Sequence, residues 1–116
     1  MTINLAAFMP LLVLFILLLS AHAICDYPLQ GDFLARAKYG TVEGFPKWLG
    51  LLVHAWIHAT GVMLVTGNLL AGGIELVAHY VIDLLKTQRR FGIVIDQGLH
   101  VATKLVLVYL RARGRL

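Results

Sequence analysis

The stretch LLLSAHAICDYPLQ, from Leu17 to Gln30, decides how the chain folds. Its AHA tripeptide at 21–23 resembles the small-residue site at which a secretory signal peptide is cleaved. Alternatively, the stretch is the end of a membrane helix that carries His22 and Asp26 and is ended by Pro28. No Lys or Arg precedes the apolar run, whereas a signal peptide usually begins with a positively charged region. We therefore favour the membrane helix.

The composition is that of a membrane protein. Of the 116 residues, 59% are hydrophobic and 14% are charged, against roughly 25% charged residues in soluble proteins. The length allows a single domain, 1–116, and the one cysteine, Cys25, excludes an internal disulfide and a thiolate metal site. Basic residues give a net charge of +4 but lie between and after the apolar runs, so we expect membrane lipid as partner and no nucleic acid.

Apolar runs predict helices over roughly 4–26, 46–67, 69–87 and 92–112, each long enough to cross a hydrocarbon core of about 30 Å. The connection 27–45 contains FLARAKYG, which is expected to form a short amphipathic helix on the membrane surface. HAICD in the first run and HYVID in the third share the pattern His-x-x-x-Asp. We therefore predict an all-α integral membrane four-helix bundle, built of two helical hairpins that form a parallel pseudo-repeat.

Basic residues give conflicting signals about orientation. Those in the two connections on one side are Arg36, Lys38, Lys47, Lys86, Arg89 and Arg90. The positive-inside rule makes this side cytoplasmic in a multi-pass membrane protein. The residues Arg111, Arg113 and Arg115, after the last apolar run, favour the opposite orientation.

Most histidines and acidic residues recur at a spacing of four. Of the five His and six acidic residues, nine form the series His22/Asp26, His54/His58, Glu75/His79/Asp83 and Asp96/His100. Residues four apart lie on one face of a helix, and ionisable groups at membrane depth face the interior of a bundle. We therefore expect four polar stripes that face each other.

In an antiparallel hairpin, one helix runs up as the other runs down. Two residues at the same depth on the two helices therefore have residue numbers that add up to the same value for every such pair. This predicts the level pairs Asp26/His54, His22/His58, Asp83/Asp96, His79/His100 and Glu75/Lys104. Opposite charges at one depth relieve each other's desolvation, so Glu75 and Lys104 are expected to form a buried ion pair. The remaining level pairs place the His and Asp side chains in one cluster near the cytoplasmic side.

Imidazole and carboxylate together are a usual ligand set for zinc, manganese and iron. The expected ligands of one or two divalent ions are His22, Asp26, His54, His58, His79, Asp83, Asp96 and His100. Three further side chains, Glu75, Gln30 and Gln97, are candidates to orient ligands through hydrogen bonds. For Gln30, at the rim, and Gln97 the alternative is a hydrogen bond to a lipid headgroup. The alternative for any single histidine is a packed, hydrogen-bonded side chain without a metal.

Four segments together resemble a known family. They are AHAICDYPLQGDFLARAK, LLVHAWIHA, ELVAHYVIDLLK and IDQGLHVAT, and the chain resembles the small bacterial and phage membrane proteins grouped as domain of unknown function 3307 (DUF3307). The recurring positions of that family correspond here to His22, Asp26, Gln30, His54, His58, His79, Asp83, Asp96, Gln97 and His100. The resemblance implies the fold, the site and a multi-pass location in the bacterial cytoplasmic (inner) membrane, but no reaction. The motifs are also similar to those of membrane-bound metal-dependent hydrolases.

Three functions follow from these patterns. The first is a metal-dependent membrane hydrolase with a dinuclear site, acting on a phosphoester or ester of a lipid-linked small substrate. The second is a metal-ion or proton transporter, and the third is a non-enzymatic small membrane protein of phage type or a subunit of a complex. A homo-oligomer could complete the site in any of them.

Overall fold

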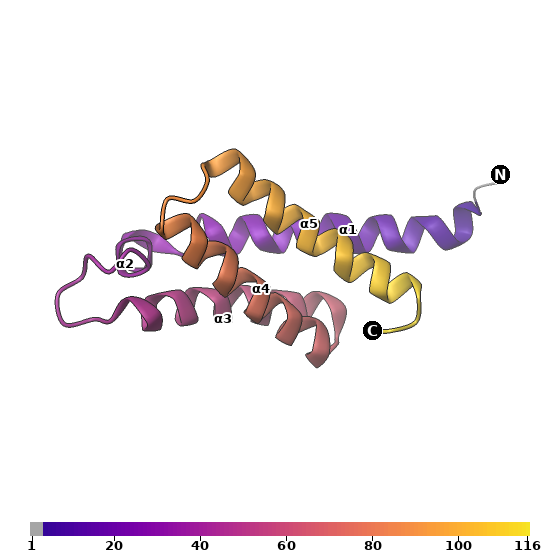
Figure 1. Cartoon of the computed structure of the whole chain (residues 1–116). Helices are drawn as coiled ribbons and strands as arrows, with labels where there is room; N and C mark the ends of the chain where they lie inside the picture. The colour runs from indigo at the N-terminus through magenta and orange to yellow at the C-terminus, as the bar shows by residue number, and fades with distance from the viewer. Residues whose placement is uncertain (1–3) are drawn as a thin grey trace.

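The computed structural model describes residues 4–116, within which the chain is all-α and has no strand. Its helices are α1 (Leu5–Asp26), α2 (Gly31–Ala37), α3 (Lys47–Thr66), α4 (Leu69–Thr87) and α5 (Ile93–Ala112) (Figure 1). The four long helices begin and end within one residue of the ranges expected from the apolar runs. The short helix α2 lies inside the connection 27–45.

A two-residue joint connects α3 to α4. Gly67 adopts the left-handed conformation, with φ 63°, which glycine tolerates best, and ends α3. The side chain of Asn68 accepts a hydrogen bond of 2.9 Å from the backbone N–H of Ala71 and so caps α4. Beyond this turn the two helices approach so closely that a Cβ atom at Gly72 would overlap the side chain of Met63. The short joint and the missing side chain together hold α3 and α4 against each other.

The four long helices form a ring of pairwise contacts. Helix α1 packs against α3 and α5, and α4 packs against α3 and α5, while α2 packs against α3. The most extensive of these contacts is between α3 and α4, which the sequence analysis assigned to different hairpins. The hairpin pseudo-repeat therefore stays a prediction.

Three described helices, α1, α3 and α5, are long and apolar enough to cross a membrane. Helix α4 carries Glu75, Asp83 and Lys86 and is not among them. The exposed surface of the long helices is strongly apolar: Phe8 on α1 and Val106 on α5 are each about half exposed. An apolar surface of this extent fits contact with lipid.

The interior of the ring is layered along the helix direction. At one end lies an apolar core made by all four long helices, with Leu14, Leu18, Val62, Ala71 and Leu107. The histidines and acidic residues lie one to three turns from this core along each long helix, in the direction of α2 and the α4–α5 connection. The polar layer thus lies at the end of the ring that is covered by α2.

Candidate metal centre

All five histidines are buried in this polar layer. Helix α1 supplies His22, α3 supplies His54 and His58, α4 supplies His79 and α5 supplies His100, and none is more than 7% exposed. The rings of His58 and His79 stack with centroids 3.7 Å apart. The four polar stripes therefore face each other, as the spacing of four predicts.

Asp26, at the end of α1, is surrounded by imidazoles. Its Oδ1 atom lies 3.1 Å from Nε2 of His54 and 3.0 Å from Nε2 of His58. Its Oδ2 atom lies 3.3 Å from Nε2 of His22 and accepts a hydrogen bond of 3.3 Å from Nε2 of Gln97. One carboxylate thus connects three histidines from two helices.

Asp83, on α4, is the second centre of the cluster. Its Oδ1 atom lies 3.2 Å from Nε2 of His100. Its Oδ2 atom lies 3.3 Å from Nε2 of His79 and 3.6 Å from Nε2 of His54. Since His54 also contacts Asp26, the two carboxylates belong to one continuous cluster.

Asp96 and Gln97, in the first turn of α5, complete the cluster. Oδ1 of Asp96 lies 3.4 Å from Nε2 of His100, and Oδ2 accepts hydrogen bonds from Nε2 of Gln97 at 2.9 Å and Nζ of Lys86 at 3.3 Å. The other amide atom of Gln97, Oε1, lies 3.2 Å from Nε2 of His22. Gln97 therefore contacts side chains of the cluster from α1 and α5, as expected for a residue that orients ligands.

The expected ion pair between Glu75 and Lys104 is present and fully buried. Nζ of Lys104 donates to Oε1 of Glu75 at 2.6 Å, and both side chains are at most 1% exposed. The same Oε1 atom lies 3.2 Å from Nδ1 of His79. Because a carboxylate that already accepts from an ammonium group is ionised, Nδ1 of His79 must carry the donated proton.

This hydrogen bond decides what the other nitrogen of His79 can do. In a neutral imidazole with a protonated Nδ1, Nε2 is an acceptor, and here it faces Oδ2 of Asp83 at 3.3 Å. Among residues 4–116, Nε2 of His79 has no hydrogen-bond partner, and neither does Oδ1 of Asp96. Nε2 of His79 and Oδ2 of Asp83 are thus two acceptors that face each other in a buried site. Such a pair requires a cation between the two atoms, either a proton or a metal ion.

The spacing of the donor atoms fits a metal ion. Zinc bonds of about 2.0–2.1 Å in a tetrahedron place neighbouring ligand atoms roughly 3.3 Å apart, close to the nitrogen–oxygen distances around Asp26 and Asp83. Three groups have donor atoms within 4.8 Å of one another: His22/His58/Glu75/His79, Asp26/His54/His58/His79 and His79/Asp83/His100. Buried His, Asp and Glu groups of this kind could hold a metal ion.

Lys38 is a residue of the site that the sequence analysis missed. It was counted as an anchor on the membrane surface, but it is 9% exposed and its Nζ donates to Oδ2 of Asp83 at 3.1 Å. A signal was available in FLARAK: Lys38 follows Leu34 by four residues, on the face of α2 that also buries Ala37. The close approach of α2 to α3 at Gly50 brings Lys38 inward, since a Cβ atom at Gly50 would lie 2.7 Å from the carbonyl carbon of Ala37.

Lysines compensate three of the four buried or half-buried carboxylates. The pairs are Glu75–Lys104, Asp83–Lys38 and Asp96–Lys86. Within the described part of the chain, Asp26 has no lysine or arginine partner and contacts histidines instead. Uncompensated negative charge therefore remains where three imidazoles meet one carboxylate.

A cavity of about 200 Å³ opens beside the cluster, between the end of α1, the end of α2 and the start of α5. Its polar lining residues are Asp26, Gln30, Lys38, Asp83, Lys86, Asp96 and Gln97. Oε1 of Gln30 is buried and has no hydrogen-bond partner among residues 4–116. Its amide is therefore available to a molecule in the cavity, and the role of Gln30, in orienting a ligand or in binding a headgroup, stays a prediction.

Comparison with known proteins identifies the family and nothing further. No curated protein and no solved structure matches the chain. The family model described as "Protein of unknown function (DUF3307)" matches residues 14–114. This range contains every histidine and aspartate of the cluster. The chain therefore belongs to the DUF3307 family, as the four sequence segments indicate.

Proposed function

We propose that this protein is a metal-dependent membrane hydrolase that cleaves a phosphoester or ester bond of a lipid-linked substrate. The observation that carries the proposal is the buried meeting of five imidazoles and three aspartates, in which Nε2 of His79 and Oδ2 of Asp83 face each other at 3.3 Å. The ions would be one or two of zinc, manganese or iron, which accept both nitrogen and oxygen ligands.

The charges and contacts suggest how the eight ligands would be shared between two ions. One ion would be held by the uncompensated Asp26 together with His22, His54 and His58. A second would be held by His79, Asp83, Asp96 and His100. Divalent ions at such sites act as Lewis acids, which polarise a phosphoryl or carbonyl oxygen and acidify water.

Residues around the cavity have roles that suit an anionic substrate. The ammonium groups of Lys38 and Lys86 line it and can bind negatively charged oxygens after leaving Asp83 and Asp96. The amides of Gln30 and Gln97 can orient the substrate through hydrogen bonds. Oδ1 of Asp96, which has no hydrogen-bond partner among the described residues, has a lone pair available to the second ion.

The substrate class follows from where the cluster lies. Helices α1, α3 and α5 can cross a membrane, and we infer that α4 crosses with them, its charged groups turned inward, to make a four-helix membrane bundle. The cavity then lies at one end of the bundle beside the surface helix α2, at the level of the lipid headgroups. We place this end at the cytoplasmic side of a bacterial cytoplasmic membrane, because both connections there are basic.

A transporter needs a polar path to both faces of the membrane. In the described chain, the interior beyond the Glu75–Lys104 pair is the apolar core that contains Leu18 and Leu107. A purely structural protein, in turn, gives no reason for burying eight ligand side chains at membrane depth. All eight come from one chain, so the cluster itself needs no second copy, although a homo-oligomer could still shape the cavity.

The proposal is tested first by elemental analysis of the protein purified in mild detergent without chelators. We expect about one to two equivalents of a transition metal, most of which is lost in Asp26→Asn. The matched control is Asp32→Asn, on the exposed face of α2, which should retain the metal. A wild-type protein that is folded and hydrolyses lipid phosphoesters or esters without metal would contradict the proposal.

Activity then separates the three functions. Purified protein is assayed for hydrolysis of lipid phosphoesters and carboxylic esters, and metal flux is measured in proteoliposomes. Metal-dependent hydrolysis without flux supports the hydrolase, whereas flux without hydrolysis establishes the transporter. A protein with neither activity, whose biological effect survives combined His54→Gln and His100→Gln changes, is the non-enzymatic protein.

A further inference from the structure

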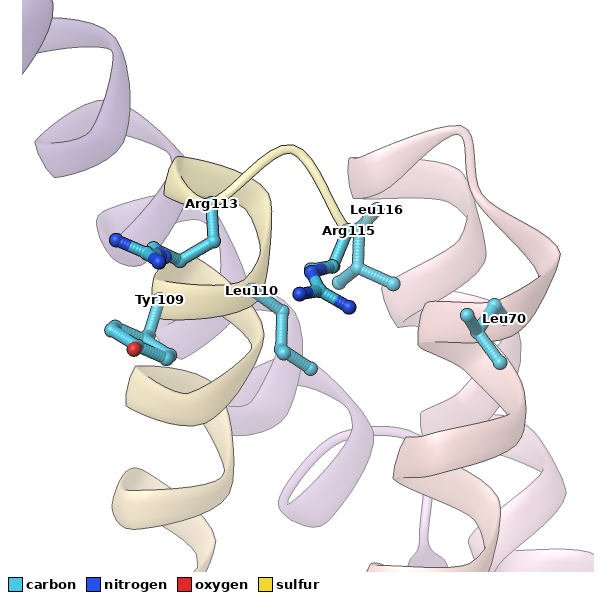
Figure 2. A pocket seen from close by; sticks show the side chains of 6 residues that line it. All are labelled: Leu70, Tyr109, Leu110, Arg113, Arg115 and Leu116. Atoms are coloured by element: carbon cyan, nitrogen blue, oxygen red, sulfur yellow. The ribbon is translucent and has the colours of Figure 1, made fainter.

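A second cavity lies at the opposite end of the molecule from the His/Asp cluster. It has a volume of about 510 Å³ and is lined by Leu70, Tyr109, Leu110, Arg113, Arg115 and Leu116 (Figure 2). Leu70 is in the first turn of α4, and Tyr109 is in the last turn of α5. The cluster, by contrast, includes Asp96 in the first turn of α5. The two sites thus lie at opposite ends of a helix that can cross a membrane.

The segment that follows α5 is folded back and held in place. Gly114 has φ 70°, in the left-handed region that favours glycine. This turn lets the backbone N–H of Arg115 donate to the carbonyl of Leu110 at 2.8 Å and that of Gly114 donate to the carbonyl of Arg111 at 3.0 Å. Leu116 then packs against the apolar core of the helices. The backbone that carries the basic residues of this segment is therefore held against the end of α5.

Two guanidinium groups at the cavity lack a protein partner. Figure 2 shows the two side chains on different sides of the end of α5: Arg113 points outward above Tyr109, whereas Arg115 lies on the side of Leu110 and Leu116. Within residues 4–116, neither arginine forms a salt bridge, and no acidic side chain is among those that line the cavity. Arg111 differs, because its Nη2 atom donates to the carbonyl oxygen of Thr66 at 2.7 Å.

The remaining lining is apolar or amphipathic. Leu70 and Tyr109 are each about 60% exposed, and two further leucines complete the walls. A ligand that satisfies both parts of the cavity carries an anionic group beside an apolar one. Arginine binds phosphate through two parallel hydrogen bonds, and tyrosine is enriched at the membrane–water interface.

We propose that this cavity binds the phosphate headgroup of an anionic phospholipid, in the leaflet opposite to the His/Asp cluster. The site accounts for the conflict in the charge pattern. The positive-inside rule disfavours arginines on this face of the membrane. Arg113 and Arg115 are explained there if they bind a specific lipid instead of setting the orientation of the protein in the membrane. The lipid is a structural ligand and not the substrate, because the cluster lies at the other end of α5.

The test measures lipid retained by the full chain, using native mass spectrometry in a neutral detergent during titration with phosphatidylglycerol. We expect one tightly held phosphatidylglycerol and no comparable retention of phosphatidylcholine. The double variant Arg113→Gln/Arg115→Gln should need at least about tenfold more lipid for the same retention. The matched control, Arg89→Gln/Arg90→Gln, removes the same charge from exposed positions at the other end and should bind as the wild type does.

A second variant separates position from charge. Gly114→Val keeps both arginines but places a β-branched residue at φ 70°, so the folded-back segment should open and the lipid should be lost. Equal retention by the Arg113/Arg115 variant, or an equal loss in the Arg89/Arg90 control, would overturn the proposal. Inorganic phosphate that displaces the lipid at equal concentration would show a site for free anions and would also overturn it. None of these readouts depends on bound metal or hydrolysis.

Discussion

The substitution Gly50→Ala tests whether the packing of α2 on α3 places Lys38 in the cluster. A Cβ atom at Gly50 would lie 2.7 Å from the carbonyl carbon of Ala37 and 2.8 Å from its carbonyl oxygen. Both atoms belong to the backbone of α2, so they cannot move aside as the end of a flexible side chain can. Lys38 is the next residue, and its contact with Asp83 is 3.1 Å long.

The magnitude follows from these distances. Carbon atoms in favourable contact are about 3.5 Å apart, so α2 has to move outward by roughly 0.8 Å from the 2.7 Å contact. Overpacking of this kind costs about 1–3 kcal/mol, while replacing glycine by alanine inside a helix regains about 0.5–1 kcal/mol. We expect a net loss of about 0–2.5 kcal/mol, with a midpoint of about 1 kcal/mol. The loss falls mainly on α2, because α2 packs against α3.

The assay is amine acetylation of the protein in detergent, followed by peptide mass spectrometry. In the wild type, buried Lys38 should react much more slowly than Lys47, which is partly exposed. In Gly50→Ala, the two lysines should react at similar rates. The control is Gly73→Ala, where the added Cβ atom meets nothing within 4 Å in the described chain. This control should keep Lys38 protected and should leave the unfolding temperature unchanged or higher.

One result would refute the reasoning. If Gly50→Ala keeps Lys38 as protected as the wild type and unfolds at the higher temperature expected of a simple glycine replacement, α2 does not depend on Gly50 to reach α3. The placement of Lys38 would then need another explanation.

Two further substitutions test buried interactions of the helices. Glu75→Gln leaves the ammonium group of Lys104 buried and unpaired, so we expect a loss of about 3–5 kcal/mol, measured by denaturant unfolding in mixed micelles. The double variant Glu75→Gln/Lys104→Met should recover most of that loss, and a double variant as unstable as the single one would contradict the ion-pair account. Arg111→Gln removes the 2.7 Å hydrogen bond to the carbonyl of Thr66 and should lower stability by about 1.5–3 kcal/mol; an unchanged thermal midpoint would show that solvent replaces this bond.

The sequence predicts the helices and much of the cluster because both depend on regular backbone geometry. Residues four apart share a helix face whatever surrounds the helix, which is why the His and Asp stripes could be recognised. The depth of residues in antiparallel helices follows from the rise per residue. This arithmetic predicts the contact between Asp26 and His54, and the ion pair between Glu75 and Lys104.

Contacts that depend on an irregular segment could not be predicted in this way. The 27–45 connection has no fixed register with the long helices, so Lys38 was assigned to the membrane surface although it reaches Asp83. The segment after α5 turns back at Gly114, which helical periodicity does not describe. For Gln30 the sequence left open whether it orients a ligand or faces a headgroup, and only the structure shows that it lines the neighbouring cavity.

Hydropathy and spacing are enough to predict which residues form helices, which faces are polar and which side chains lie at the same depth. The pairing of the helices and the distance between them are evident only once the chain is folded. The reason is steric: the close approaches occur where a side chain is missing, at Gly50 between α2 and α3 and at Gly72 between α3 and α4. A single hydrogen atom in place of a side chain has no signature in hydropathy, yet at Gly50 it allows α2 to bring Lys38 to the carboxylate of Asp83.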